Sequence, residues 1–140
     1  MQGFGSDRLR DEIILVARIL LVLLFIIFGW GKITGFSGTV GYMAHSGLPL
    51  PWAAAIIAIV IEFFVSIAIV VGVYTRPLAL VMAVYTLATA FIGHPYWAMT
   101  GMAQFEAEIN FFKNVSIVGG FLLLYVTGPG RYAVHYGAAR

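Results

Sequence analysis

Long apolar runs, separated by short polar and turn-rich stretches, dominate the hydropathy pattern of the chain. Four runs approach the roughly 20 residues that a helix needs to cross the hydrocarbon core of a bilayer. They predict transmembrane helices at residues 13–31, 52–74, 78–93 and 110–127. We therefore expect an all-α fold, in which residues 1–140 form a single integral membrane domain, a bundle of four transmembrane helices.

Turn residues separate these runs. Gly47-Leu48-Pro49-Leu50-Pro51 ends the first loop and starts the second helix, since proline is well tolerated in a first helical turn. Thr75-Arg76-Pro77 predicts a tight link that makes the second and third helices antiparallel neighbours. Gly128-Pro129-Gly130 ends the fourth helix. Two long loops remain, at residues 32–50 and 94–109.

The distribution of basic residues predicts how the helices are oriented. One side of the predicted membrane holds most of the arginines, and the opposite loops hold only Lys32, with Lys113 just inside the fourth helix. The positive-inside rule then places both termini in the cytoplasm and the tryptophans, Trp97 included, at the outer interface. The arginines on the predicted inner side are Arg8, Arg10, Arg76, Arg131 and Arg140.

The first helix begins after a charged stretch, as a signal peptide does. Its length and the sequence Gly29-Trp30-Gly31-Lys32 do not fit a signal peptide with a cleavage site, so we interpret it as a retained helix.

Composition narrows the class of protein further. Of the 140 residues, 61% are apolar and 10% are charged, whereas a soluble domain carries roughly 25% charged residues. Lipid is therefore the expected solvent of the helices. The net charge of +2 without a basic stripe argues against nucleic acid as a partner. The absence of cysteine excludes disulfides, thiolate metal sites and a CxxC redox pair.

Glu62 is the most informative residue, because it lies near the middle of the second apolar run. An ionised carboxylate at that depth must be paired or else be protonated. Arg18 in the first helix and Lys113 in the fourth are the candidate partners, and depth alone does not choose between them. We expect all three side chains to face the bundle interior. Two interpretations stay open, a functional group and a structural ion pair.

Other polar residues add candidates at or near the predicted helix ends. Asn114 needs a partner inside the membrane, and it serves either as a contact between helices or as a ligand for a bound molecule. His94 ends the third helix at the outer interface, where it can exchange protons with water. A haem is not expected: His45 and His94 both lie on the outer side, but His45 is in a loop, and His135 lies on the inner side. No carboxylate–histidine cluster has metal-ligand spacing, so no metal site is predicted.

Several short motifs occur along the chain in a definite order. They are Arg18, Phe28-Gly29-x-Gly31-Lys32, Gly47-Leu48-Pro49, Glu62, Gly72-x-x-x-Arg76, Gly93-His94 and Phe112-Lys113-Asn114. Their order and spacing resemble the DoxX family of bacterial membrane proteins. Further motifs, at residues 38–43, 92–97 and 113–117, resemble the YphA-type inner-membrane members of this family. The resemblance covers nearly the whole chain.

The resemblance implies a four-helix protein of the bacterial inner membrane with an association to redox biology. Our leading hypothesis is a quinone- or quinol-interacting component of a membrane oxidoreductase system, acting with a redox partner subunit. Glu62 and His94 are the candidate catalytic residues; the candidate ligand-binding residues are Arg18, Lys32, Lys113, Asn114 and Trp97. Whether the chain is itself an enzyme stays open. The alternatives are a non-enzymatic scaffold or assembly subunit and a small-solute or proton transporter, for which a homo-oligomer would build the path.

Overall fold

The computed structural model describes residues 4–134 as a series of helices. Arg140, one of the arginines on the predicted inner side, and His135 lie outside the described residues. The all-α fold is confirmed for that part of the chain. The helices are α1 (Phe4–Thr34), α2 (Phe36–His45), α3 (Pro51–Ile59), η1 (Val60–Val65), α4 (Ser66–Val71), α5 (Thr75–Gly93), η2 (Tyr96–Ala98) and α6 (Gly101–Thr127).

Four segments of the described chain are long and apolar enough to cross a membrane: residues 7–34, 51–71, 75–98 and 101–127. The second segment is composite, because α3, the π-helix η1 and α4 follow one another without a break. In a π-helix each N–H bonds five residues back, and such turns occur mostly as single-turn bulges within α-helices. Glu62 lies in η1.

Helix is more extensive than the hydropathy pattern predicts. The predicted first loop contains α2, and the predicted third loop is shortened because α6 begins at Gly101. The added start of α6 carries Gln104, Glu106 and Glu108, polar residues that lower hydropathy without disfavouring helix. A search for apolar runs therefore finds the apolar part of α6 and misses its polar start.

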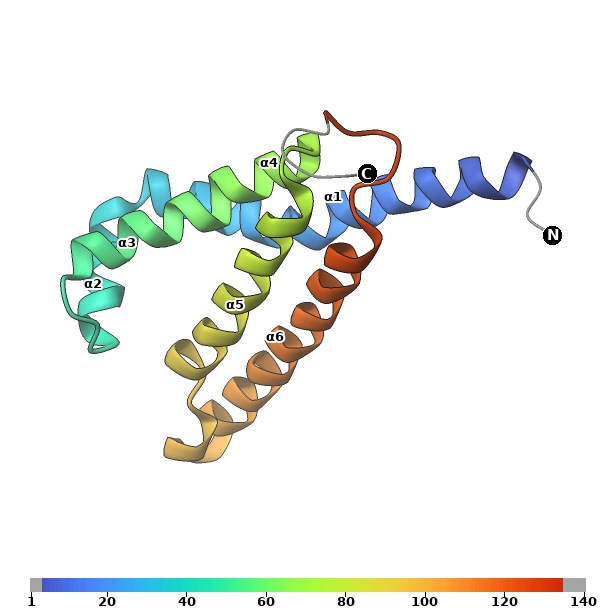
Figure 1. Ribbon diagram of the computed structural model, residues 1–140. Coiled ribbons are helices and arrows are strands. Elements are labelled where there is room, and N and C mark those ends of the chain that lie inside the picture. The colour runs from blue at the N-terminus through green and yellow to red at the C-terminus, as the bar shows by residue number, and fades with distance from the viewer. Residues whose placement is uncertain (1–3, 135–140) are drawn as a thin grey trace.

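Two helical pairs make up the fold and meet at one end (Figure 1). In one pair α1 lies beside the composite segment of α3, η1 and α4, and in the other α5 packs against α6. The chain reverses between α4 and α5 at Gly72–Tyr74, just before the predicted link, since Thr75-Arg76-Pro77 already forms the first turn of α5. From this turn α5 diverges from the composite segment of α3, η1 and α4. The predicted second and third helices are therefore neighbours near the turn but not along their whole length.

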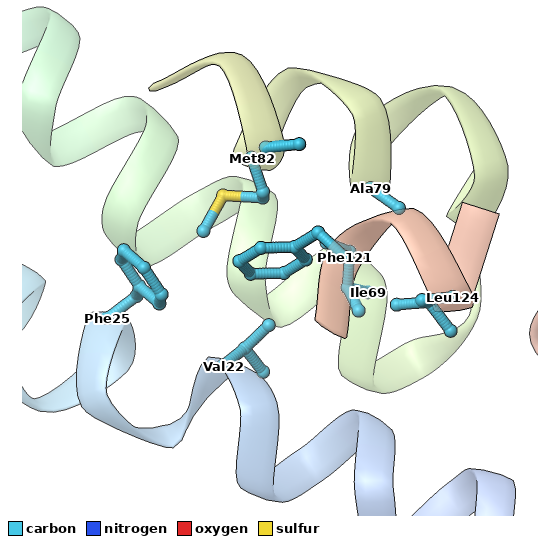
Figure 2. Close-up of a cluster of buried hydrophobic side chains, with 8 residues drawn as sticks. Val22, Phe25, Ile69, Ala79, Met82, Phe121 and Leu124 are labelled. Atoms are coloured by element: carbon cyan, nitrogen blue, oxygen red, sulfur yellow. The ribbon is translucent and has the colours of Figure 1, made fainter. Parts of the chain in front are cut away.

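A cluster of buried apolar side chains joins the two pairs (Figure 2). Phe121 of α6 packs between the pairs, with its ring centroid 5.7 Å from that of Phe25 of α1. A second, smaller cluster packs α2 on α3 through Met43, Ala55 and Ala58. The other labelled members of the first cluster are Val22, Ile69, Ala79, Met82 and Leu124.

Candidate functional site

The carboxylate of Glu62 is buried, with 7% of the residue exposed, and it is bonded on both oxygens. The ammonium of Lys32 donates to Oε1 at 2.9 Å, and the hydroxyl of Tyr85 donates to Oε2 in a very short hydrogen bond. These three residues come from α1, η1 and α5, so they join the two helical pairs. We call them the Lys32–Glu62–Tyr85 cluster.

Lys32 reaches Glu62 because α1 continues past the apolar run. The helix ends at Thr34, so Lys32 lies in its last turn. Side chains on a helix tilt toward its N-terminus, which here directs the lysine back toward the membrane interior. The apolar run ends at residue 31, which places Lys32 in a loop outside the membrane. The sequence alone therefore does not suggest Lys32 as the partner of Glu62.

The Lys32–Glu62 pair is mostly shielded from solvent and lipid. The side chains are 24% and 9% exposed, respectively, so loss of either partner would leave a poorly solvated charge. Tyr85 supplies a neutral donor to the second carboxylate oxygen, which completes the hydrogen bonding of the anion. The cluster is thus a buried ion pair whose carboxylate also accepts a hydrogen bond from a phenol.

An apolar groove lies beside this cluster. It has a volume of about 500 Å³ and runs along the exposed side of α5, with Tyr85 in its lining. Ile61, the neighbour of Glu62 in the chain, forms part of the opposite wall. Tyr85 therefore connects the buried ion pair with the groove. The groove is large enough for the ring and first chain atoms of a lipid-like molecule. The remaining lining residues are Pro77, Leu80, Val81, Val84 and Ala88.

Arg18 faces the interior as predicted, with 1% of the residue exposed, but Glu62 is not its partner. Its guanidinium donates to three backbone carbonyls: Pro129 at 2.5 Å, Tyr132 at 2.6 Å and Val70 at 2.8 Å. The carbonyl of Val70 belongs to the last turn of α4, where carbonyls lack helical partners and the helix dipole favours a cation. Arg18 thus ties α1 to the end of α4 and to the C-terminal loop.

The prediction that Lys113 faces the interior is wrong. Lys113 is exposed on α6 and donates to Oδ1 of Asn110 at 3.1 Å, one turn earlier on the same helix. The rotation of α6 places Ala107, Phe111 and Phe121 on its buried face, where Phe111 packs edge-to-face on Phe91 of α5. Lys113 lies outside that face, and hydropathy alone does not reveal the rotation.

Asn114 lies between α6 and α5. Its amide donates over long distances, 3.5 Å to the carbonyl of Thr86 and 3.4 Å to the hydroxyl of Thr89. Both acceptors belong to α5, so the amide connects the two helices of this pair. This contact is the helix–helix role that was one of the two alternatives for Asn114.

His94 and Trp97 lie at the far end of α5, away from the Lys32–Glu62–Tyr85 cluster. His94 follows Tyr85 by nine positions on one helix, which is about 13 Å along its axis. Trp97 is exposed in η2 and packs edge-to-face against Phe111 and Tyr96. The structure therefore does not bring His94 and Trp97 together with Glu62.

Sequence reasoning missed Tyr85 altogether. A tyrosine in an apolar run counts as an ordinary aromatic residue, and its hydroxyl gives no sign of a partner on another helix. Among the described residues, no group of three or more His, Asp or Glu side chains is placed to hold a metal ion.

The DoxX family profile matches residues 13–95, which include most of α1 and the whole of η1 and α5, and therefore all three members of the cluster. The chain belongs to the DoxX family. It is 59% identical over 134 residues to inner membrane protein YphA of Escherichia coli K12, covering 96% of both chains. It is 45% identical over 130 residues to inner membrane protein YqjF of the same organism, covering 91% of this chain and 92% of the relative.

A more distant similarity links this DoxX-family chain to a fission yeast protein, the Surfeit locus protein 4 homolog of Schizosaccharomyces pombe. The identity is 25% over 122 residues, which cover 86% of this chain and 35% of the yeast protein. No solved structure matches the chain. With four segments able to cross a bilayer and close relatives named as inner membrane proteins, the chain is an inner membrane protein.

Proposed function

We propose that this DoxX-family protein binds a quinone or quinol in the bacterial inner membrane, as a component of an oxidoreductase system. The observation that carries the proposal is the position of Tyr85. Its hydroxyl is bonded to the buried carboxylate of Glu62, and its side chain lines the apolar groove. A quinone has the matching chemistry, an apolar ring and tail with two carbonyl oxygens that accept hydrogen bonds.

In this proposal the cluster supplies hydrogen bonds and handles protons. A quinone ring in the groove packs against the ring of Tyr85. For its carbonyl to accept the O–H of Tyr85, that O–H must leave the carboxylate of Glu62, to which it is donated in the structure. When a quinol is oxidised it releases two electrons and two protons. The carboxylate of Glu62 accepts one proton, relayed through the hydroxyl of Tyr85, and the other proton leaves with the electrons to the partner. The electrons pass to a redox partner subunit. His94, at the far end of α5, exchanges protons with the aqueous side.

The orientation that we propose places both termini in the cytoplasm. Arg10, Arg76 and Arg131, from α1, the start of α5 and the C-terminal loop, line one and the same pocket. They therefore lie at one end of the protein, whereas Lys32 lies at the other end of α1. This one-sided distribution supports the orientation, because basic residues accumulate on the cytoplasmic side of inner membrane proteins.

A structural role for the cluster is the second candidate, and one observation favours it. Both oxygens of Glu62 are already bonded within the protein, as in an ion pair that only fixes helix packing. In that case the protein is a membrane scaffold or assembly subunit. The two candidates differ in whether the groove beside Tyr85 has an occupant.

The experiment separates binding from stability. Ala88→Phe fills the groove from its exposed side without touching the ion pair, and Leu123→Phe on the exposed face of α6 is the matched control. We expect a short-chain benzoquinone analogue to quench the tryptophan fluorescence of the purified parent protein and of Leu123→Phe. We expect Ala88→Phe to lose saturable quenching while its thermal unfolding in detergent is unchanged.

Two results would decide against quinone binding. If the parent protein shows no saturable binding while Glu62→Gln lowers its thermal stability, the scaffold function is correct. If Ala88→Phe binds the analogue as tightly as Leu123→Phe does, the quinone does not occupy the groove.

A further inference from the structure

A second hollow lies at the opposite end of α1 from the cluster, and residues of α1, of the start of α5 and of the C-terminal loop line it. Figure 1 shows where these three parts of the chain lie. It has a volume of about 710 Å³. Three arginines and one aspartate contribute to its lining, so its charge is positive. The arginines are Arg10, Arg76 and Arg131, the aspartate is Asp11, and Thr127 and Gly130 also line the pocket.

The single carboxylate in this pocket is already engaged. Oδ1 of Asp11 accepts a hydrogen bond from the backbone N–H of Arg131 at 3.2 Å, which holds the loop against α1. A pocket with three guanidinium groups and one such carboxylate attracts anions.

A glycine of the C-terminal loop lies directly against the guanidinium of Arg76. Gly128 is buried and has a φ of +73°, and a Cβ at this position would lie 2.9 Å from Nε and 3.0 Å from Nη2 of Arg76. Only glycine accommodates both that backbone conformation and that guanidinium.

The Nε atom of Arg76 is buried and has no hydrogen-bond partner among the described residues. A buried donor without an acceptor is costly. Because Nε is covered by the loop, an anion in the pocket would meet the terminal nitrogens of the Arg76 guanidinium. Guanidinium groups match phosphate oxygens in particular, because their N–H groups form a planar fork.

We propose that this pocket binds the phosphate of an anionic phospholipid headgroup. The site lies where three of the membrane-spanning segments end or begin, since the first begins at Asp7, α5 begins at Thr75 and α6 ends at Thr127. Lipid phosphates occupy that level of the membrane. The side chain of Ile14 gives the pocket an apolar wall next to the arginines, which suits the start of an acyl chain. Basic pockets between membrane helices bind anionic headgroups by the same physics. The proposal does not depend on quinone binding.

The test uses the full-length protein, stripped of lipid in detergent and then titrated with three probes. The probes are phosphatidylglycerol, phosphatidylethanolamine and inorganic phosphate, and binding is followed by native mass spectrometry and by the shift of the thermal unfolding temperature. We expect phosphatidylglycerol to bind more tightly than phosphatidylethanolamine. We expect Arg76→Gln and Arg10→Gln each to weaken phosphatidylglycerol binding about fivefold.

Arg8→Gln is the matched control, because Arg8 is exposed on α1, pairs with Glu12 and lies outside the pocket. It should bind phosphatidylglycerol as the parent does. Each variant is first checked for parental thermal unfolding without lipid, and Arg10→Gln, at an exposed position, keeps the test valid if Arg76→Gln does not fold. Equal affinity for the two lipids, or an unchanged affinity in both pocket variants, would overturn the proposal. Complete displacement of the lipid by millimolar phosphate would show that the site takes free phosphate instead.

Discussion

Gly29 of α1 lies directly against the backbone of Phe63 in η1: a Cβ on the glycine would be 2.9 Å from the backbone nitrogen of Phe63. Lys32 is one turn further along α1, and Glu62 is the neighbour of Phe63 in the chain. The close approach of the two backbones therefore sets the distance at which the lysine and the glutamate meet. Their ion pair depends on a residue that carries no side chain.

Gly29→Ala is expected to lower the free energy of unfolding by about 1–3 kcal/mol, because the added methyl group overlaps with backbone that cannot move independently. Reversible unfolding in mixed micelles measures the change. Gly31→Ala is the control, since a Cβ there meets nothing within 4 Å and alanine favours helix. Equal stability of Gly29→Ala and Gly31→Ala would contradict the proposed contact.

A double-mutant cycle should detect the Lys32–Glu62 pair. We expect Glu62→Gln alone to lower the free energy of unfolding by about 3 kcal/mol, because it leaves the lysine without a counter-charge. The double variant Lys32→Gln and Glu62→Gln should lose less than the sum of the two single losses. Additive losses would mean that the two side chains do not interact in the membrane.

Arg18→Gln is expected to lower the free energy of unfolding by about 3 kcal/mol, since three carbonyls lose a charged donor. Arg18→Lys should fall between this variant and the parent, because an ammonium lacks the planar fork that reaches several carbonyls at once. Unfolding in mixed micelles is again the measurement, with Arg8→Gln as the exposed control. An Arg18→Lys variant as stable as the parent would show that charge alone matters.

Asn114→Ala should have a small effect. Its two hydrogen bonds to α5 are long, at 3.5 and 3.4 Å, and single polar contacts between membrane helices average about 0.6 kcal/mol. Unfolding measurements should therefore place Asn114→Ala within about 1 kcal/mol of the parent. A loss like that of Arg18→Gln would mean that Asn114 holds something besides α5.

Fusions of a reporter enzyme to the two ends of the chain test the orientation. We expect a cytoplasmic reporter to be active at both termini, and a periplasmic reporter to be active when it is inserted next to His45, between α2 and α3. Periplasmic activity at the C-terminal end would reverse the orientation proposed here.

The sequence identifies Arg18 and Glu62 because a charge inside an apolar run is conspicuous and must face the interior. It does not identify their partners, since these depend on helix rotation and on where helices end. Arg18 binds backbone carbonyls, which no side-chain pattern reveals. Lys32 was assigned to a loop because the apolar run ends before the helix does, and Lys113 was assigned to the interior because hydropathy carries no information on the rotation of α6.

Hydropathy predicts the helices only where they are apolar. The four membrane-spanning segments follow from hydropathy, whereas the short helix α2 and the polar start of α6 do not. The π-helical turn at Glu62 has no local signal either, because the residues of η1, Val-Ile-Glu-Phe-Phe-Val, would also fit a regular α-helix. The widened turn is stabilised by contacts with α1 and α5, which form only when the chain has folded.

The attachment of Arg18 to the C-terminal loop also has a consequence for biosynthesis. Pro129 and Tyr132 follow Arg18 by 111 and 114 residues. At roughly 5–20 residues per second, a ribosome makes these carbonyls about 6–23 seconds after the arginine. During that interval α1 is already synthesised, but the guanidinium of Arg18 lacks two of the three carbonyls to which it donates in the folded protein. The first helix to be made thus completes the contacts of its buried cation only when the last described residues of the chain have been synthesised.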